Sequence, residues 1–228
     1  MVDKQPRISF SKQEAYRMVN SKFPPITLFD DVISAEDFET AYALQALTNP
    51  RILNALGDLT LIPTEEIPFG ITGVNYATAP FTHVNPDGSR FSDGSFGILY
   101  LADTTATAIA ETRYHQEKYF RNVEGLHYDT VDMRCLKFTF SAELIDATSI
   151  DTIHAPDDYT TSRIFGAQVK KSGEAGLQYR SVRNEASICW GLMSPSFVES
   201  AVQTRHFEFV FDGESISKVR ELKYTMSS

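Results

Sequence analysis

The order of the predicted strands and helices constrains the fold of this chain more than any other feature of its sequence. From Gly70 onward, short apolar segments with strand character outnumber helices and do not alternate with them. Strands are predicted at residues 71–77, 96–102, 136–140, 187–193, 206–211 and 216–222, and two main helices at 104–120 and 158–171. Asp212-Gly213 predicts a hairpin between the last two strands. This irregular order favours an α+β fold over a doubly wound sheet.

The first part of the chain has a different pattern, and we expect residues 1–68 to form a helical N-terminal arm or subdomain before a domain at 69–228. Ser11 followed by Glu14 predicts the start of one helix, because a serine at the cap and an acid three residues later satisfy the first backbone N–H groups. Ser34 and the acids after it predict a second helix. Prolines interrupt the segments between and after these helices.

Composition and charge exclude several classes of function. The chain has 228 residues, 42% of them hydrophobic, which is enough for a sizeable core. Its 30 acidic and 21 basic residues give a net charge of −9, which argues against direct binding of nucleic acid or anionic lipid. We find no apolar run that could cross a membrane and no apolar signal segment, so we expect a cytoplasmic protein without membrane contact.

The cysteines and histidines predict neither a disulfide framework nor a metal site. Cys135 and Cys189 are too few for either, and we expect both to be buried as small hydrophobic residues. The five histidines are scattered, and Glu111 with His115 supplies at most two ligands on one helix, whereas zinc sites need three or four.

The segment from residue 88 to 115 holds the strongest candidates for a functional site. Arg90 lies in a turn with Gly88, Gly94 and Gly97, which we expect to allow close approach of a ligand to the backbone. Tyr100 lies near the end of the strand that follows. Glu111 and His115 are four residues apart on the next helix and therefore share one face, above small alanines. Asp103, Thr104 or Thr105 would cap that helix.

The residue types alone leave non-functional alternatives open. Arg90 could be a solvated turn residue, and Glu111 with His115 an exposed helical pair worth about 0.2–0.5 kcal/mol. Tyr100 on an apolar strand could belong to the core. Ser181 could bond only to nearby backbone.

Taken together, the order of these residues resembles the RES domain, a family named for its Arg, Glu and Ser. Arg90 is followed ten residues later by Tyr100 and eleven residues further by Glu111, and the string Gly176-Leu-Gln-Tyr-Arg-Ser-Val-Arg-Asn184 comes later in the chain. The resemblance covers about residues 70–213 and identifies Arg90, Tyr100, Glu111 and Ser181 as the family's arginine, tyrosine, glutamate and serine. Many members carry Gly-Gly-Arg-Trp where this chain has Gly-Ser-Arg-Phe, so the aromatic residue here is Phe91.

The resemblance implies a fold similar to that of ADP-ribosylating toxins, with split mixed and antiparallel sheets, and it implies NAD+ as substrate. Cleavage of the nicotinamide–ribose bond develops positive charge on the ribose, which a carboxylate such as Glu111 stabilises. Arg90 would grip the pyrophosphate through paired hydrogen bonds. Tyr100 would stack on the cationic nicotinamide. Ser181 would bond to ribose or to the nicotinamide amide, and His115 would line the pocket.

The activity expected from the resemblance is that of a toxin of a type II toxin–antitoxin system, a mono-ADP-ribosyltransferase that passes ADP-ribose from NAD+ to a protein. The expected partner is an Xre-like antitoxin that covers the active site and carries any contact with DNA. Two alternatives stay open. One is an NAD+ glycohydrolase or phosphorylase that depletes the cell of NAD+, and the other is a nucleotide-binding module without catalysis.

Overall fold

The computed structural model describes residues 2–22, 34 and 57–223 of the chain. Its strands are β1 (Arg7–Asn20), β2 (Leu99–Ala102), β3 (Asp129–Asp146), β4 (Gly176–Arg180), β5 (Ile188–Leu192), β6 (Val198–Phe211) and β7 (Ile216–Leu222). Its α-helices are α3 (Val74–Thr82), α4 (Thr105–Arg121) and α5 (Thr160–Lys171). Short 3-10 turns are η1 (Val2–Lys4), η3 (Leu59–Leu61), η4 (Thr64–Glu66), η5 (Asp151–Ile153) and η6 (Pro195–Phe197).

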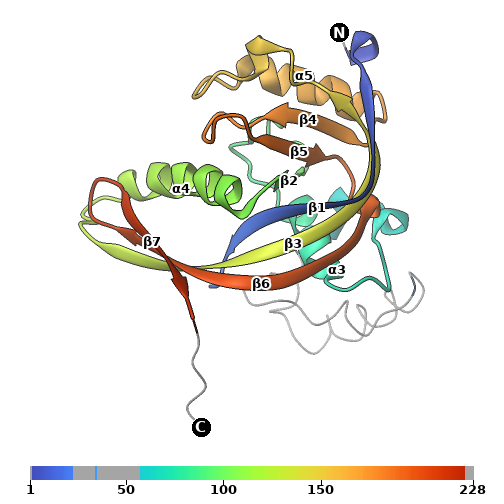
Figure 1. Ribbon diagram of the computed structural model, residues 1–228. Coiled ribbons are helices and arrows are strands. Elements are labelled where there is room, and N and C mark those ends of the chain that lie inside the picture. The colour runs from blue at the N-terminus through green and yellow to red at the C-terminus, as the bar shows by residue number, and fades with distance from the viewer. Residues whose placement is uncertain (1, 23–33, 35–56, 224–228) are drawn as a thin grey trace.

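The strands form one mixed sheet in the order β1-β2-β5-β4-β3-β6-β7, and β1 also pairs with β3. All pairs are antiparallel except β3 with β4, which run parallel where Ile145 lies opposite Leu177. The long strands β1, β3, β6 and β7 therefore form one antiparallel part, and the short strands β2, β5 and β4 join it at the end of β3 (Figure 1). This arrangement confirms the predicted α+β class with its split, mixed sheet.

Strand β3 contributes to both hydrophobic cores of the protein, because successive side chains of a strand point to opposite faces. Met133 and Cys135 pack into the core beneath α4 and α5. Leu136, Phe138 and Phe140 pack into the second core, together with α3. The helices accordingly cover the sheet from two sides, with α3 on the side away from α4 (Figure 1).

Several predicted elements are confirmed. Helices α4 and α5 lie where the sequence predicts them, and β2, β3, β5, β6 and β7 each contain or overlap a predicted strand. The hairpin at Asp212-Gly213 is also present, because β6 and β7 pair antiparallel on either side of it. Its Asp212 carboxylate accepts hydrogen bonds from the backbone of Glu214 and Ser215.

Two predictions of local structure are wrong. The segment from Ser11 to Glu14 is not the start of a helix but part of β1, which pairs with β3 from Arg7↔Ile145 to Asn20↔Met133. Pairing with a distant strand overrides a local capping signal. Residues 71–77, predicted as a strand, contain the start of α3, whose first residue follows Gly73 at φ 79°.

The helical arm is not confirmed. The second predicted helix, after Ser34, lies outside the described residues. The division of the chain at residues 68 and 69 stays a prediction, although β1 belongs to the same sheet as the strands after residue 69.

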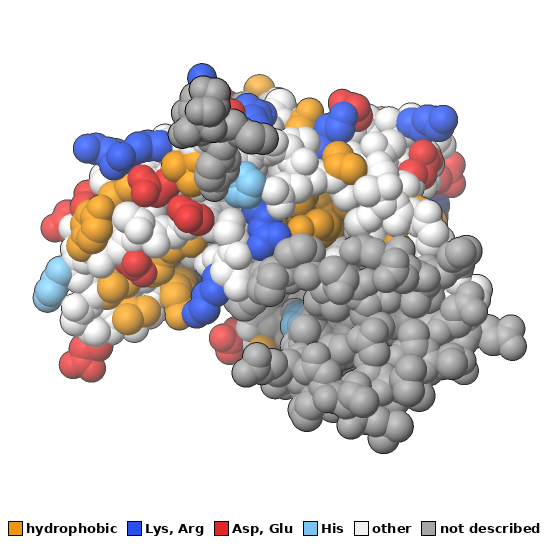
Figure 2. Space-filling model, turned by 90° about the horizontal axis from the view of Figure 1, so that it is seen from below, with side chains coloured by type: hydrophobic (Ala, Val, Ile, Leu, Met, Phe, Trp, Pro, Cys, Tyr) orange, Lys and Arg blue, Asp and Glu red, His pale blue; other side chains and the backbone are white. Residues whose placement is uncertain are grey.

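None of the helices in the described part of the chain is long and apolar enough to cross a membrane. On the face shown in Figure 2, acidic and basic side chains are interspersed over the described surface and do not gather into one basic stripe.

Candidate functional site

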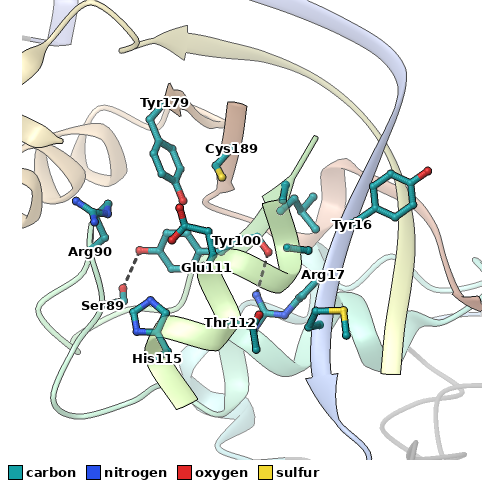
Figure 3. A pocket seen from close by; sticks show the side chains of 14 residues that line it. Tyr16, Arg17, Ser89, Arg90, Tyr100, Glu111, Thr112, His115, Tyr179 and Cys189 are labelled. Atoms are coloured by element: carbon teal, nitrogen blue, oxygen red, sulfur yellow. Dashed lines mark hydrogen bonds between the residues drawn. The ribbon is translucent and has the colours of Figure 1, made fainter. Parts of the chain in front are cut away.

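A cavity of about 220 Å³ lies between β1, β2 and α4, and four of the predicted site residues line it. These residues are Arg90, Tyr100, Glu111 and His115. They come from a turn, a strand and a helix, and Figure 3 shows them grouped around one hollow. The structure thus brings these four side chains together, while their roles in binding and catalysis stay predictions.

Helix α4 carries Glu111 and His115 to the cavity. The helix begins after Thr104, whose hydroxyl accepts a hydrogen bond of 3.1 Å from the backbone N–H of Thr107. Among the three predicted caps, Thr104 is the one that acts, while Asp103 accepts a hydrogen bond from the backbone of Ile188 on β5. Both contacts hold the start of α4 in place, and Glu111 follows about two turns after the cap.

Ser181 does not line this cavity but holds its carboxylate. The hydroxyl of Ser181 donates a hydrogen bond of 2.6 Å to Oε1 of Glu111. Oγ of Ser181 also accepts hydrogen bonds from the backbone N–H groups of Arg183 and Asn184, at 3.2 and 3.0 Å. Ser181 therefore does bond to nearby backbone, as one alternative held, but only as an acceptor. Its hydroxyl proton is donated to Glu111. Ser181 also lines a second hollow of about 670 Å³, on its other side.

Arg90 is buried, with 7% of its surface exposed, which contradicts the solvated-turn alternative. Its Nη1 donates to the carbonyl oxygens of Ala155 (2.8 Å) and Ile153 (3.4 Å). Its guanidinium stacks on the ring of Tyr159, with 4.5 Å between Cζ and the ring centre. Within the described residues, no carboxylate lies within ion-pair distance of Arg90. The charge is therefore available to an anion in the cavity.

The glycines around Arg90 are needed for the fold of the turn. Gly88 adopts φ +78°, and a Cβ atom on it would lie 2.5 Å from the backbone oxygen of Ser92. A Cβ atom on Gly97 would lie 2.3 Å from the backbone oxygen of Pro80. Both are closer than carbon and oxygen can approach, so these positions need glycine for the packing of the chain against itself.

Tyr100 supports the same turn. Its hydroxyl accepts a hydrogen bond of 3.0 Å from the backbone N–H of Phe91 and shares one of 2.7 Å with the hydroxyl of Ser89. Burial raises the pKa of Tyr100 to about 12. Its ring is stacked near that of Phe91, with 6.5 Å between ring centres. Tyr100 is thus a neutral phenol that fixes the position of Arg90 and presents part of its ring to the cavity.

Apart from Glu111 and the arginines, the titratable side chains that line the cavity with a shifted pKa are neutral near pH 7. Burial lowers the pKa of His115, despite the opposing effect of Glu111, so the imidazole is neutral near pH 7. Burial also raises the pKa of Tyr179 well above its usual value. The thiol of Cys189 likewise has a raised pKa because it is buried, which makes it a poor nucleophile. Cys135 and Cys189 are both buried free cysteines, as predicted.

The prediction missed five polar residues that line the cavity, namely Tyr16, Arg17, Ser89, Thr112 and Tyr179. Ser89 and Tyr179 lie inside the two motifs already singled out, beside Arg90 and Ser181, so their position was a usable signal. Arg17 lies on β1, in a segment predicted as helical, and no local pattern marks it. In the described part of the chain, no three histidine, cysteine or acidic side chains converge as metal ligands.

A family model, one relative and one solved structure were found to be similar to the chain. The family model described as the RES domain matches residues 67–212. A protein of Sinorhizobium fredii (strain NBRC 101917 / NGR234), described as uncharacterized protein y4oC, is 30% identical over 208 residues, which cover 90% of this chain and 86% of that protein. The crystal structure of the M. tuberculosis MbcT-MbcA toxin-antitoxin complex has a chain that aligns with a TM-score of 0.37 and 11% identity, over 52% of this chain and 73% of that chain.

Proposed function

Because the chain belongs to the RES domain family, we propose that it is an NAD+-consuming toxin that cleaves the nicotinamide–ribose bond and transfers ADP-ribose to a protein. The observation that carries this proposal is the pairing of Glu111 with Ser181 at a cavity that also contains the unpaired cation of Arg90. A fixed carboxylate and a guanidinium facing one hollow suit a substrate with a positive reacting centre and a negative tail.

The reaction proposed for this site is a displacement at the ribose. The bond between the nicotinamide nitrogen and ribose C1′ breaks, and its electron pair leaves with the nitrogen. The nucleophilic atom of the acceptor forms the new bond to C1′ and gives up its proton. Glu111 stabilises the positive charge that develops on the ribose, and the hydroxyl of Ser181 keeps the carboxylate oriented toward it.

The other residues are assigned to binding. Arg90 binds the pyrophosphate, since a guanidinium offers several parallel donors to phosphate oxygens. The ring of Tyr100 stacks on the nicotinamide. His115, as a neutral imidazole, forms part of the cavity wall beside Glu111. A cavity of about 220 Å³ is smaller than typical nucleotide pockets, so the adenylate end is assigned to the space outside it.

The test uses NAD+ labelled on the adenylate, incubated with the wild type, Glu111→Gln and Glu124→Gln in the presence of cell extract. Glu124 is an exposed acid after α4 and serves as the matched control. We expect label on protein with the wild type and with Glu124→Gln, and turnover lowered about 10²- to 10³-fold with Glu111→Gln. Label found only as free ADP-ribose would mean that the protein hydrolyses NAD+, and label found only as an ADP-ribose phosphate would mean phosphorolysis. Either result would refute transfer to a protein. Equal and negligible release of nicotinamide by all three proteins would mean that the protein is a nucleotide-binding module without catalysis.

The proposed biological role includes an Xre-like antitoxin that covers the cavity. Expression of the toxin alone is expected to arrest growth, and Glu111→Gln is expected to relieve the arrest. Growth at the normal rate with abundant folded wild-type protein would contradict the toxin role.

A further inference from the structure

Strand β1 brings a second arginine to the cavity, from a part of the chain outside the residues that match the family. Arg17 lines the cavity between Tyr16 and Met18 and lies outside residues 67–212. Its Nη1 donates a hydrogen bond of 3.1 Å to the backbone carbonyl oxygen of Tyr100. Figure 3 shows Arg17 and Arg90 on either side of Glu111.

The charge of Arg17 has no carboxylate partner among the residues that the structure describes. By contrast, surface arginines such as Arg7, Arg113 and Arg220 pair with acidic side chains. The chain has 30 acids for 21 basic residues, so acidic partners are abundant. Burial lowers the pKa of the Arg17 guanidinium, which means that its environment disfavours the cation. A cation held in this way destabilises the ligand-free protein.

The one hydrogen bond to Tyr100 does not account for an arginine at this position. A guanidinium carries five N–H donors, and a neutral amide side chain could donate to the same carbonyl at lower electrostatic cost. No other acceptor for this guanidinium is found among the described residues, so its remaining donors are available to an acceptor in the cavity. Since they are charged, the best acceptor is an oxyanion.

We propose that Arg17 binds a phosphate oxyanion in the substrate complex, from the wall across Glu111 from Arg90. This inference rests on the proposed use of a nucleotide substrate. The bond to Tyr100 orients the guanidinium, and Arg17 and Arg90 approach the bound phosphate oxygens from opposite walls of the cavity. The phosphate belongs either to the dinucleotide itself or to free phosphate that enters the cavity with it, and the two sources share the same recognition chemistry.

The test measures binding by calorimetry with the full-length wild type, Arg17→Gln and the control Arg220→Gln on exposed β7. The probes are ADP-ribose, nicotinamide riboside, which has no phosphate, and inorganic phosphate. We expect Arg17→Gln to weaken ADP-ribose binding about ten- to a hundredfold, as for the loss of a charged hydrogen bond, and to leave nicotinamide riboside unchanged. If free phosphate is the source, Arg17→Gln instead loses phosphate binding and keeps ADP-ribose binding.

Thermal stability separates binding from a structural role. Replacing a disfavoured cation by a neutral amide should leave the melting temperature of the ligand-free protein unchanged or higher, whereas a structural arginine predicts a lower one. Arg17→Lys retains the charge without the planar donors and is expected to fold and to bind with intermediate affinity. It provides the second measurement if Arg17→Gln does not fold.

Wild-type affinity for both ADP-ribose and phosphate in Arg17→Gln would overturn the inference while leaving NAD+ cleavage intact. Phosphate binding that depends on Arg17, in a wild type that does not cleave NAD+, would support the inference and refute the proposed function. A wild type that binds neither ligand would refute both.

Discussion

The hydroxyl of Ser181 lies 2.6 Å from the carboxylate of Glu111, although 70 positions separate the two residues in the sequence. The bond joins the loop after β4 to the middle of α4. It also connects the two motifs of the sequence analysis, because the segment 88–115 supplies the carboxylate and the string 176–184 supplies the hydroxyl that donates to it. Predictions about the site therefore begin with this pair.

Ser181→Ala is expected to lower kcat about 10- to 100-fold with little change in KM, because Glu111 loses the donor that orients it. The variant also leaves the N–H groups of Arg183 and Asn184 without their acceptor, which should reduce the free energy of unfolding by about 1–3 kcal/mol. Steady-state kinetics and urea unfolding measure the two effects. Ser172→Ala, at an exposed hydroxyl on the end of α5, is the control. A raised KM at unchanged kcat would mean that Ser181 contacts the substrate directly.

Tyr100→Phe is expected to destabilise the protein by about 1–3 kcal/mol, because the buried N–H of Phe91 loses its acceptor. The pKa of Tyr100 is about 12, above that of an unfolded tyrosine. The unfolded state therefore loses this proton first as pH rises, and wild-type stability should fall between about pH 10 and 12. Tyr100→Phe should lack that part of the fall, and the exposed Tyr128→Phe should keep it. Identical alkaline unfolding curves for all three would refute this assignment.

Gly166→Ala is expected to lower the free energy of unfolding, although a change from glycine to alanine usually stabilises a helix. In an exposed helix this change stabilises by about 1 kcal/mol. Here a Cβ atom would lie 1.9 Å from the backbone oxygen of Phe91, so α5 must move away from the turn that holds Arg90. We expect a loss of about 3 kcal/mol or more in unfolding free energy, together with weaker nucleotide binding. Gln168→Ala, on an exposed position of the same helix, should change stability by less than about 0.5 kcal/mol.

His154 is expected to make the protein less stable in mild acid. Its Nδ1 lies 2.8 Å from the carbonyl oxygen of Ile150, and its Nε2 accepts a hydrogen bond of 3.0 Å from the backbone N–H of Arg180. Because Nε2 can accept this bond only without a proton, the contact requires the neutral ring, and burial lowers the pKa of His154. The unfolded state thus binds a proton first as pH falls below about 6.5, and stability declines from there.

Urea unfolding at about pH 7.5 and 5 measures this decline. His154→Gln should lose less stability between the two values than the wild type does, although His115, whose pKa is also lowered, contributes a similar decline to both proteins. His127→Gln, at an exposed histidine, should behave as the wild type. A wild-type decline that persists in full in His154→Gln would contradict the prediction.

The site could be predicted from the sequence to the extent that local structure determines it. Arg90, Tyr100 and Glu111 lie within one turn–strand–helix unit, where glycines, an apolar run and a helix cap are all visible in the sequence. The bond from Ser181 to Glu111 was not predictable in this way, since it depends on how β4 packs beside β5 and not on local pattern.

The same reasoning explains the errors. Segment 7–20 carries a helix-cap signal, yet it forms β1 because β3, more than a hundred residues later, offers it a complete set of backbone partners. The misassigned strand contained Arg17, so that residue was missed together with its strand. Residues 71–77 contain β-branched side chains typical of strands, but Gly73 adopts φ +79° and begins α3.

Strand β3 is shared by both cores, and this sharing has a consequence for protein synthesis. A nascent chain that has emerged only as far as α4 already contains Arg17, Arg90 and Glu111, but β1 lacks its long partner and Glu111 lacks Ser181. The hollow cannot close until the ribosome has translated β4 and β5. A growing polypeptide of this kind can therefore assemble the proposed site only after most of the chain has been translated.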